Sequence, residues 1–180
     1  YNPETNRAMP EYDPKQLSQW AQSKWKGKVS RTITGVSIDT RNLQPGEVFV
    51  ALKTPRRDGH DFLEYATQRG ASGAIVSRIN TSIRLPQLLV DDPLDALQTI
   101  AGKWRQQFEG PVIGVTGTVG KTSTVELLAL LLGEEGVHRT EGNFNNQIGV
   151  PLSLLAIFPD RHRCAVVEAG SSAPGELEVL

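Results

Sequence analysis

The chain has 180 residues, enough for one domain with a solid core or for two small ones. Its formal net charge is −1, so it lacks the large basic field that holds a nucleic-acid backbone, and no apolar run approaches the roughly 20 residues that span a bilayer. The single cysteine, Cys164, cannot form an internal disulfide and fits a reducing cytoplasm. We therefore expect a cytoplasmic protein that neither binds nucleic acid nor spans a membrane.

The first segment alternates strand and helix patterns. Met9 is the only methionine, and we expect it to be the native start. The Pro45-Gly46 pair is typical of a type II turn, and we expect Asp61 to cap a helix that Gly70 ends. Helices are predicted at residues 12–25, 62–69 and 94–108, and strands at residues 33–38, 47–52, 74–76 and 87–90.

The second segment begins after residues 109–111, Glu-Gly-Pro. Strands are predicted at residues 111–116 and 164–167, and helices at residues 121–132 and 151–158. The helix at 121–132 is apolar nearly all round, so we expect it to be covered on several sides. The alternation favours a parallel sheet with helices on its faces, in two α/β domains at residues 9–91 and 92–180. Two strands are too few for a doubly wound sheet, so we expect the second domain to be part of a longer one.

Residues 114–124, GVTGTVGKTST, carry the strongest functional signal. A strand, a glycine-rich turn and a helix that begins with Lys-Thr form a phosphate cradle, because backbone N–H groups and the helix N-terminus then face one anion. Lys121 would reach the terminal phosphates of a nucleoside triphosphate, and the Thr122 hydroxyl would contact a magnesium ion. Val115 replaces the first glycine of the strict P-loop pattern, and the alternative is a strand-to-helix corner whose glycines serve packing. The nucleotide-binding residues expected here are Gly117, Thr118, Val119, Gly120, Lys121, Thr122 and Ser123.

Three further motifs lie at strand ends or between helices. Glu168 follows an apolar strand and precedes Ala-Gly, a place that suits a magnesium ligand beside a P-loop, or else a surface glutamate. The amide-rich residues 142–149 suit phosphate, sugar or peptide contacts, or else helix caps. Arg41, in Asp39-Thr40-Arg41, could clamp a diphosphate, or else close a turn through a local salt bridge.

Taken together, these residues resemble the Mur ligases of bacterial cell-wall synthesis. Residues 35–53, GVSIDTRNLQPGEVFVALK, and 58–62, DGHDF, are similar to the family's amino-terminal UDP-binding domain. Residues 117–122 are similar to its phosphate loop, and residues 142–155, GNFNNQIGVPLSLL, are the most specific match. Residues 168–170 and 174–177 resemble the segment that carries a magnesium-binding glutamate.

The resemblance implies an ATP-dependent ligase of peptidoglycan precursor synthesis. Such an enzyme activates the terminal carboxylate of UDP-MurNAc-tripeptide as an acyl phosphate and joins it to D-Ala-D-Ala. The implied fold is a small amino-terminal α/β UDP-binding domain followed by part of a P-loop parallel-sheet ATPase domain. The implied cofactors are ATP and Mg²⁺. The resemblance implies that Lys121 and Glu168 are catalytic residues and that Thr122 and Glu168 bind the metal. It implies substrate-binding residues at Thr40, Arg41, Asn145 and Asn146.

Two positions depart from the family pattern. Val119 occupies a loop position where the family usually has a small polar residue, although its backbone N–H remains. Ser172-Ala173 stands where the family usually has Asn-His. The family also uses a carbamylated lysine and a carboxy-terminal domain, both expected beyond Leu180, so this chain alone would not turn over. The alternatives are a MurE-like or folylpolyglutamate synthase-like ligase, or a non-catalytic nucleotide-binding fragment. The oligomeric state is open, with a monomer as the expectation.

Overall fold

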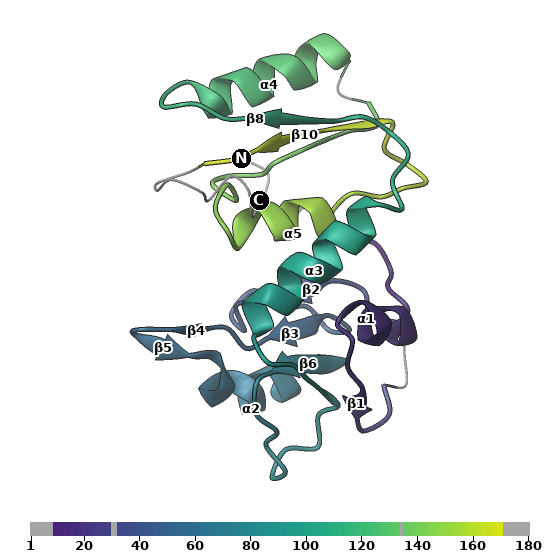
Figure 1. The fold of residues 1–180 in the computed structure, drawn as a ribbon, viewed down its shortest axis with the longest axis vertical. Coiled ribbons are helices and arrows are strands. Elements are labelled where there is room, and N and C mark those ends of the chain that lie inside the picture. Colours follow the sequence, from purple (N-terminus) through teal and green to yellow (C-terminus); the bar gives the residue numbers. More distant parts are fainter. Residues whose placement is uncertain (1–8, 30–31, 134, 171–180) are drawn as a thin grey trace. The chain divides into compact units, whose positions relative to one another are not determined.

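The computed structural model describes residues 9–29, 32–133 and 135–170. The chain divides into two compact units, and the boundary along the sequence lies between Pro93 and Leu94. Each unit has its own sheet (Figure 1). The sequence-predicted features at residues 1–8, at Ser172-Ala173 and at residues 174–177 lie outside the described residues.

The first unit is built on a five-stranded sheet in the order β1-β7-β6-β3-β2. Strands β2, β3, β6 and β7 run parallel, and β1 pairs antiparallel with β7. The strands are β1 (Trp25–Lys26), β2 (Val36–Ser37), β3 (Val48–Val50), β6 (Gly73–Val76) and β7 (Gln87–Leu89). The other elements are α1 (Pro14–Trp20), a hairpin of β4 (Lys53–Thr54) and β5 (Arg57–Asp58), the short 3-10 helix η1 (Gly59–Phe62) and α2 (Leu63–Gln68).

Local sequence signals explain much of this unit. Pro45 and Gly46 form the predicted type II turn, in which Gly46 has a φ of +94° and the Glu47 N–H donates to Gln44 O at 3.1 Å. The predicted Asp61 cap is wrong. The chain turns into η1 before α2 begins, and Asp58 caps it by accepting from the His60 N–H at 2.9 Å.

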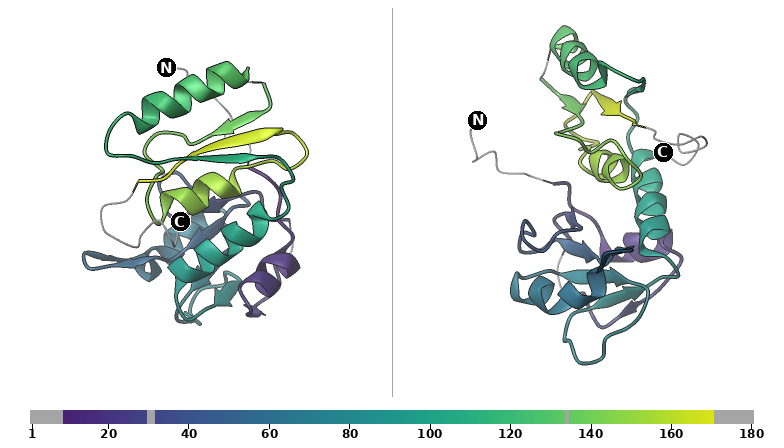
Figure 2. Two further views of the ribbon diagram at one scale, coloured as in Figure 1. Left: turned by 45° about the horizontal axis from the view of Figure 1, so that its top comes forward. Right: turned by 90° about the vertical axis from the view of Figure 1, so that its left-hand side faces the viewer.

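The second unit has a three-stranded parallel sheet in the order β8-β10-β9. Its strands are β8 (Val112–Val115), β9 (Val137–Arg139) and β10 (Cys164–Glu168), and its helices are α3 (Pro93–Arg105), α4 (Lys121–Leu132) and α5 (Gly149–Leu155). Helices α4 and α5 lie on opposite faces of the sheet (Figure 2). The register pairs Glu168 with Val115, so the carboxyl ends of β8 and β10 meet at one edge.

The core of the second unit follows the alternation of β10. Val166 packs with Val115 and Val125 on the α4 face, whereas Ala165 and Val167 belong to the cluster on the α5 face. The expectation that α4 is covered on several sides is wrong for the residues that the structure describes. Its fully buried residues are Val125 and Ala129, while Leu127, Leu130 and Leu131 are 59%, 57% and 83% exposed.

Candidate functional site

The glycines of the loop between β8 and α4 serve backbone conformation. Gly117 and Gly120 have φ values of +147° and +78°, in the region that glycine favours. A Cβ on Gly120 would meet nothing within 4 Å, and one on Gly117 would meet only the Val119 carbonyl oxygen at 3.8 Å. Close packing therefore does not explain these glycines, and the loop leaves open space in front of them.

The N-terminus of α4 opens onto this loop. Gly120 is its N-cap, no side chain caps it, and no acidic side chain occupies its first turn. The Thr124 N–H makes the first bond of the helix, to Gly120 O at 2.9 Å. The N-terminal turn of this helix therefore presents backbone N–H groups and the positive end of the helix dipole to the loop. That combination attracts an anion such as a phosphate.

The Lys121 side chain folds back onto the same loop. Its Nζ donates to Gly117 O at 2.7 Å, so the ammonium group lies at the beginning of the glycine turn. A phosphate that enters the loop would meet this cation together with the backbone N–H groups.

Glu168 closes the other side of the site. It is the last residue of β10 and is only 3% exposed, so it is not the surface glutamate that its sequence position also allowed. Its Oε2 accepts from Thr122 Oγ1 at 2.9 Å, and its Oε1 accepts from Asn145 Nδ2 at 2.7 Å. The structure thus brings together Thr122, Glu168 and Asn145, which lie far apart in the sequence.

The oxygen pair of Thr122 and Glu168 fits Mg²⁺. Magnesium prefers oxygen ligands in an octahedron with bonds near 2.0–2.1 Å, so two neighbouring ligand atoms lie about 2.9 Å apart. The Thr122 Oγ1 and Glu168 Oε2 atoms have this separation. No cluster of three or more His, Cys, Asp or Glu that could hold a metal occurs among the described residues. A magnesium ion would therefore take its remaining ligands from phosphate and water, as is usual for this ion.

Asn146 has a local role in the structure. Its Oδ1 accepts from the Ile148 N–H at 3.0 Å and from the Gly149 N–H at 2.9 Å, and so it caps the turn that leads into α5. The capping alternative for the amide-rich loop is therefore present at Asn146, while contacts of this loop with phosphate, sugar or peptide stay a prediction. Asn146 acts as a helix cap, whereas the Asn145 side chain contacts Glu168.

Thr40 and Arg41 lie in the first unit, after the carboxyl end of β2. The Arg41 guanidinium is paired with Asp39, with Nε to Oδ1 at 2.9 Å, and this hydrogen bond lowers the pKa of Asp39. The local salt bridge that the sequence allowed is therefore present. Arg57 also lowers the pKa of Asp39 through its charge, which places a second cation near this turn.

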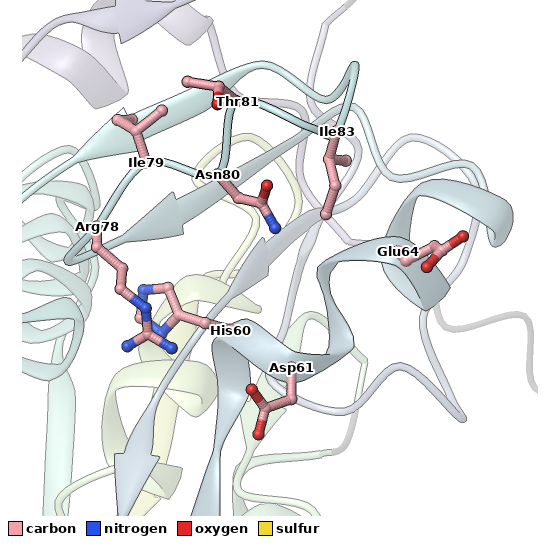
Figure 3. Close-up of a pocket in the computed structure, with 8 residues that line it drawn as sticks. All are labelled: His60, Asp61, Glu64, Arg78, Ile79, Asn80, Thr81 and Ile83. Atoms are coloured by element: carbon pink, nitrogen blue, oxygen red, sulfur yellow. The ribbon is translucent and has the colours of Figure 1, made fainter.

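A hollow of about 380 Å³ lies elsewhere in the first unit (Figure 3). Its lining includes Asp61 and Glu64, so it is poorly suited to a diphosphate. Arg78 lies beside His60 in this hollow and is paired with Asp58 at 2.8 Å. Both ring nitrogens of His60 are engaged, Nδ1 with Asp58 at 2.7 Å and Nε2 as acceptor of the Ser77 N–H at 3.1 Å. His60 is therefore a structural residue.

Sequence reasoning missed Thr140, whose Oγ1 accepts from the Glu168 N–H at 2.9 Å. The signal was a polar residue directly after a short strand, as Glu168 is directly after the strand predicted at residues 164–167. Strand β9 was not predicted, so this position went unnoticed. No helix among the described residues is long and apolar enough to cross a membrane.

Two family models match the chain. The Mur ligase family, catalytic domain, matches residues 32–105, and the Mur ligase middle domain matches residues 115–180. Two curated relatives, the UDP-N-acetylmuramoyl-tripeptide–D-alanyl-D-alanine ligases of Synechocystis and Bacillus subtilis, are each 44% identical over 151 residues. These residues are 82% of this chain and 33% of either relative. The chain thus spans about a third of the length of the curated relatives it matches.

Solved structures give the same result. MurF from Acinetobacter baumannii matches 96% of this chain and 38% of its own, with a TM-score of 0.88 and 33% identity. MurF from Thermotoga maritima in complex with ADP matches 84% of this chain and 34% of its own, with a TM-score of 0.70 and 35% identity. The α/β architecture with parallel sheets is that of these structures. Family models, relatives and solved structures agree, and the chain belongs to the Mur ligase family.

Proposed function

We propose that this chain forms the UDP-substrate and nucleotide-binding parts of a ligase that joins D-Ala-D-Ala to UDP-MurNAc-tripeptide. The observation that carries the proposal is the juxtaposition of Thr122 and Glu168 at 2.9 Å beside an open glycine loop. The relatives' names supply the substrates, and the T. maritima structure with bound ADP supports nucleotide binding.

Each residue of the second-unit site has a part in this proposal. The backbone of residues 117–123 binds the ATP phosphates, and Lys121 offsets charge on the phosphoryl group that is transferred. Thr122 and Glu168 would hold Mg²⁺, which would supply further neutralisation of that charge. A carboxylate oxygen of the tripeptide attacks the γ-phosphorus, and the bond from that phosphorus to ADP breaks. The D-Ala-D-Ala amine then attacks the acyl carbon, phosphate leaves, and the amine loses a proton.

The first unit would bind the UDP end of the substrate near Thr40 and Arg41. Loops after parallel strands meet at one sheet edge, and residues 38–41 and 51–53 follow β2 and β3 there. Arg41, Lys53 and Arg57 bring positive charge to these loops and to the adjoining hairpin. A diphosphate would compete with Asp39 for the Arg41 guanidinium.

The nucleotide site is tested by titrating the chain with ADP and ATP in the presence of magnesium. We expect Lys121→Ala to weaken ATP binding by about 2 kcal/mol, close to thirty-fold in Kd, because it removes a charged hydrogen bond to phosphate. Lys103→Ala, which removes an exposed lysine from α3, is the matched control and should bind as wild type does. Equal affinity for ATP in wild type and Lys121→Ala would reject the site.

The ligase reaction is tested on the complete polypeptide. Release of ADP should require UDP-MurNAc-tripeptide and D-Ala-D-Ala together. Nucleotide binding without turnover by the complete polypeptide would favour the alternative of a non-catalytic nucleotide-binding protein. Turnover with another amino-acid acceptor in place of D-Ala-D-Ala would favour a MurE-like or folylpolyglutamate synthase-like ligase.

A further inference from the structure

The segment that follows β9 makes four hydrogen bonds with β10 and the residues just after it. These contacts come from Thr140 and Asn145, and they flank the carboxylate to which the proposed function gives magnesium. Neither residue needs to touch the ion to influence it, because the groups that orient a metal ligand also govern its affinity.

Thr140 takes the place of a backbone acceptor in the sheet. Its own N–H donates to Val166 O at 3.0 Å, which extends the parallel ladder between β9 and β10. In a ladder that continued, the Glu168 N–H would donate to the backbone carbonyl of residue 140. The Glu168 N–H instead donates to Thr140 Oγ1 at 2.9 Å. The peptide that carries the Glu168 side chain is therefore oriented by a hydroxyl group.

A buried chain of hydrogen bonds holds that hydroxyl in place. Thr140 Oγ1 lies 3.1 Å from Ser153 Oγ on α5, and Ser153 Oγ lies 3.2 Å from His138 Nε2 on β9. All three side chains are buried. When His138 is neutral with its proton on Nδ1, Ser153 donates to Nε2 and Thr140 donates to Ser153, so each hydroxyl proton is used once. Burial lowers the pKa of His138 to about 4, which keeps it neutral near pH 7.

Asn145 holds the carboxylate itself. Its Nδ2 donates to Glu168 Oε1 at 2.7 Å, which leaves Oε2 directed at Thr122. Its backbone oxygen accepts from the Gly170 N–H at 2.6 Å. A Cβ on Gly170 would lie 3.3 Å from Asn145 Cγ, so the glycine permits this close approach. The loop therefore contacts the chain at Glu168 and again at Gly170.

We infer that Thr140 and Asn145 are positioning residues for Glu168: Thr140, backed by Ser153 and His138, orients its backbone, and Asn145 orients its carboxylate toward the nucleotide-bound magnesium. The inference rests on the proposed function. It assigns to the loop after β9 control over magnesium affinity, in addition to any contact of that loop with substrate.

The test is the magnesium concentration that gives half-maximal ATP binding. Thr140→Val removes the hydroxyl with little change in volume, and we expect it to raise that concentration about ten-fold, at the lower end for groups that orient metal ligands. Thr140→Ser retains the hydroxyl and should restore a value close to wild type. Asn145→Ala should raise the concentration as well, and it carries the test if Thr140→Val does not fold.

A matched control separates positioning from general stability. Thr67→Val removes a hydroxyl that donates to Leu63 O at 2.8 Å on α2, in the other unit. It should lower thermal stability without changing the magnesium dependence. An unchanged magnesium dependence in both Thr140→Val and Asn145→Ala, with a changed one in Glu168→Gln, overturns the inference and leaves the proposed function intact. If ATP binding by the wild-type chain does not depend on magnesium and Lys121→Ala does not change ATP affinity, both the inference and the proposed function are overturned.

Discussion

His138 is a base that folding removes from water. Burial, and after it the positive charge of His162, whose ring centroid is 5.3 Å away, together lower its pKa to about 4. The unfolded chain therefore binds a proton at a higher pH than the folded chain does, and stability falls as the pH drops from about 6.5 toward 4. We expect the free energy of unfolding of the second unit to fall by about 2 kcal/mol between pH 7 and pH 5 because of this group.

Hydrogen exchange of the β10 amides at the two pH values measures this loss. His138→Gln removes the titrating group, so its free energy of opening should change less between pH 7 and pH 5. The same pH dependence in wild type and in His138→Gln would mean that His138 does not titrate differently in the folded and unfolded chains.

Residues of the site differ in how far sequence could predict them. Gly117, Gly120, Lys121 and Thr122 are close together in the chain, and their chemistry is readable from spacing alone. The contact of Thr140 with Glu168 joins residues 28 positions apart and depends on the register of β9 beside β10. A sequence pattern contains no register between distant strands, so this contact required the fold.

At the scale of elements, α4 combines a buried side with an exposed leucine side. Val125 is 1% exposed and packs against the sheet, whereas Leu131 is 83% exposed. Large exposed apolar patches mark contact surfaces. We expect Leu131→Lys to lower the binding of an apolar dye by the chain, with little change in its free energy of unfolding.

Val125→Ala on the same helix is the comparison for this prediction. It removes buried apolar volume and should cost about 2 kcal/mol in unfolding free energy, as measured by urea denaturation. If Leu131→Lys costs as much as Val125→Ala, then the leucine side of α4 is covered in solution.

The bounds of the helices and strands show which elements a sequence pattern can predict. The bounds of α4 agree with the predicted helix at 121–132, because a glycine stands at each of its ends. Helix α1 ends earlier than predicted, at Trp20, and Gln22 just beyond it has a φ of +50°. Strand β9 has only three residues, Val-His-Arg, and buries the histidine rather than an apolar side chain. Its strand character comes from pairing with β10, which composition does not reveal.

At the scale of the whole molecule, two units with separate cores carry the two proposed sites. The apolar cluster of the first unit includes Phe49 and Ala74, and those of the second include Val125 and Val167. If the proposed sites are correct, substitutions in different units should act on different ligands. We expect Arg41→Ala to weaken UDP binding several-fold, because the site loses a bidentate cation, and to leave ADP affinity unchanged.

Calorimetric titration of the chain with UDP and with ADP measures both effects. Lys121→Ala provides the reciprocal case, since it should weaken ADP binding and spare UDP. An Arg41→Ala chain that binds UDP as tightly as wild type would remove Arg41 from the proposed substrate site.

The hydrogen bond between Thr122 and Glu168 also has a consequence for the rate at which the proposed site would bind magnesium. The hydroxyl and carboxylate oxygens lie at the separation that neighbouring magnesium ligands adopt, and α4 and β10 position them. If this pair holds magnesium, much of the ordering of the two side chains is completed during folding, and less conformational entropy is left to lose on capture of the ion. Magnesium releases its own water reluctantly. The slow step of capture would then lie in the hydration shell of the ion, and the rate would be insensitive to changes that only stiffen the loop.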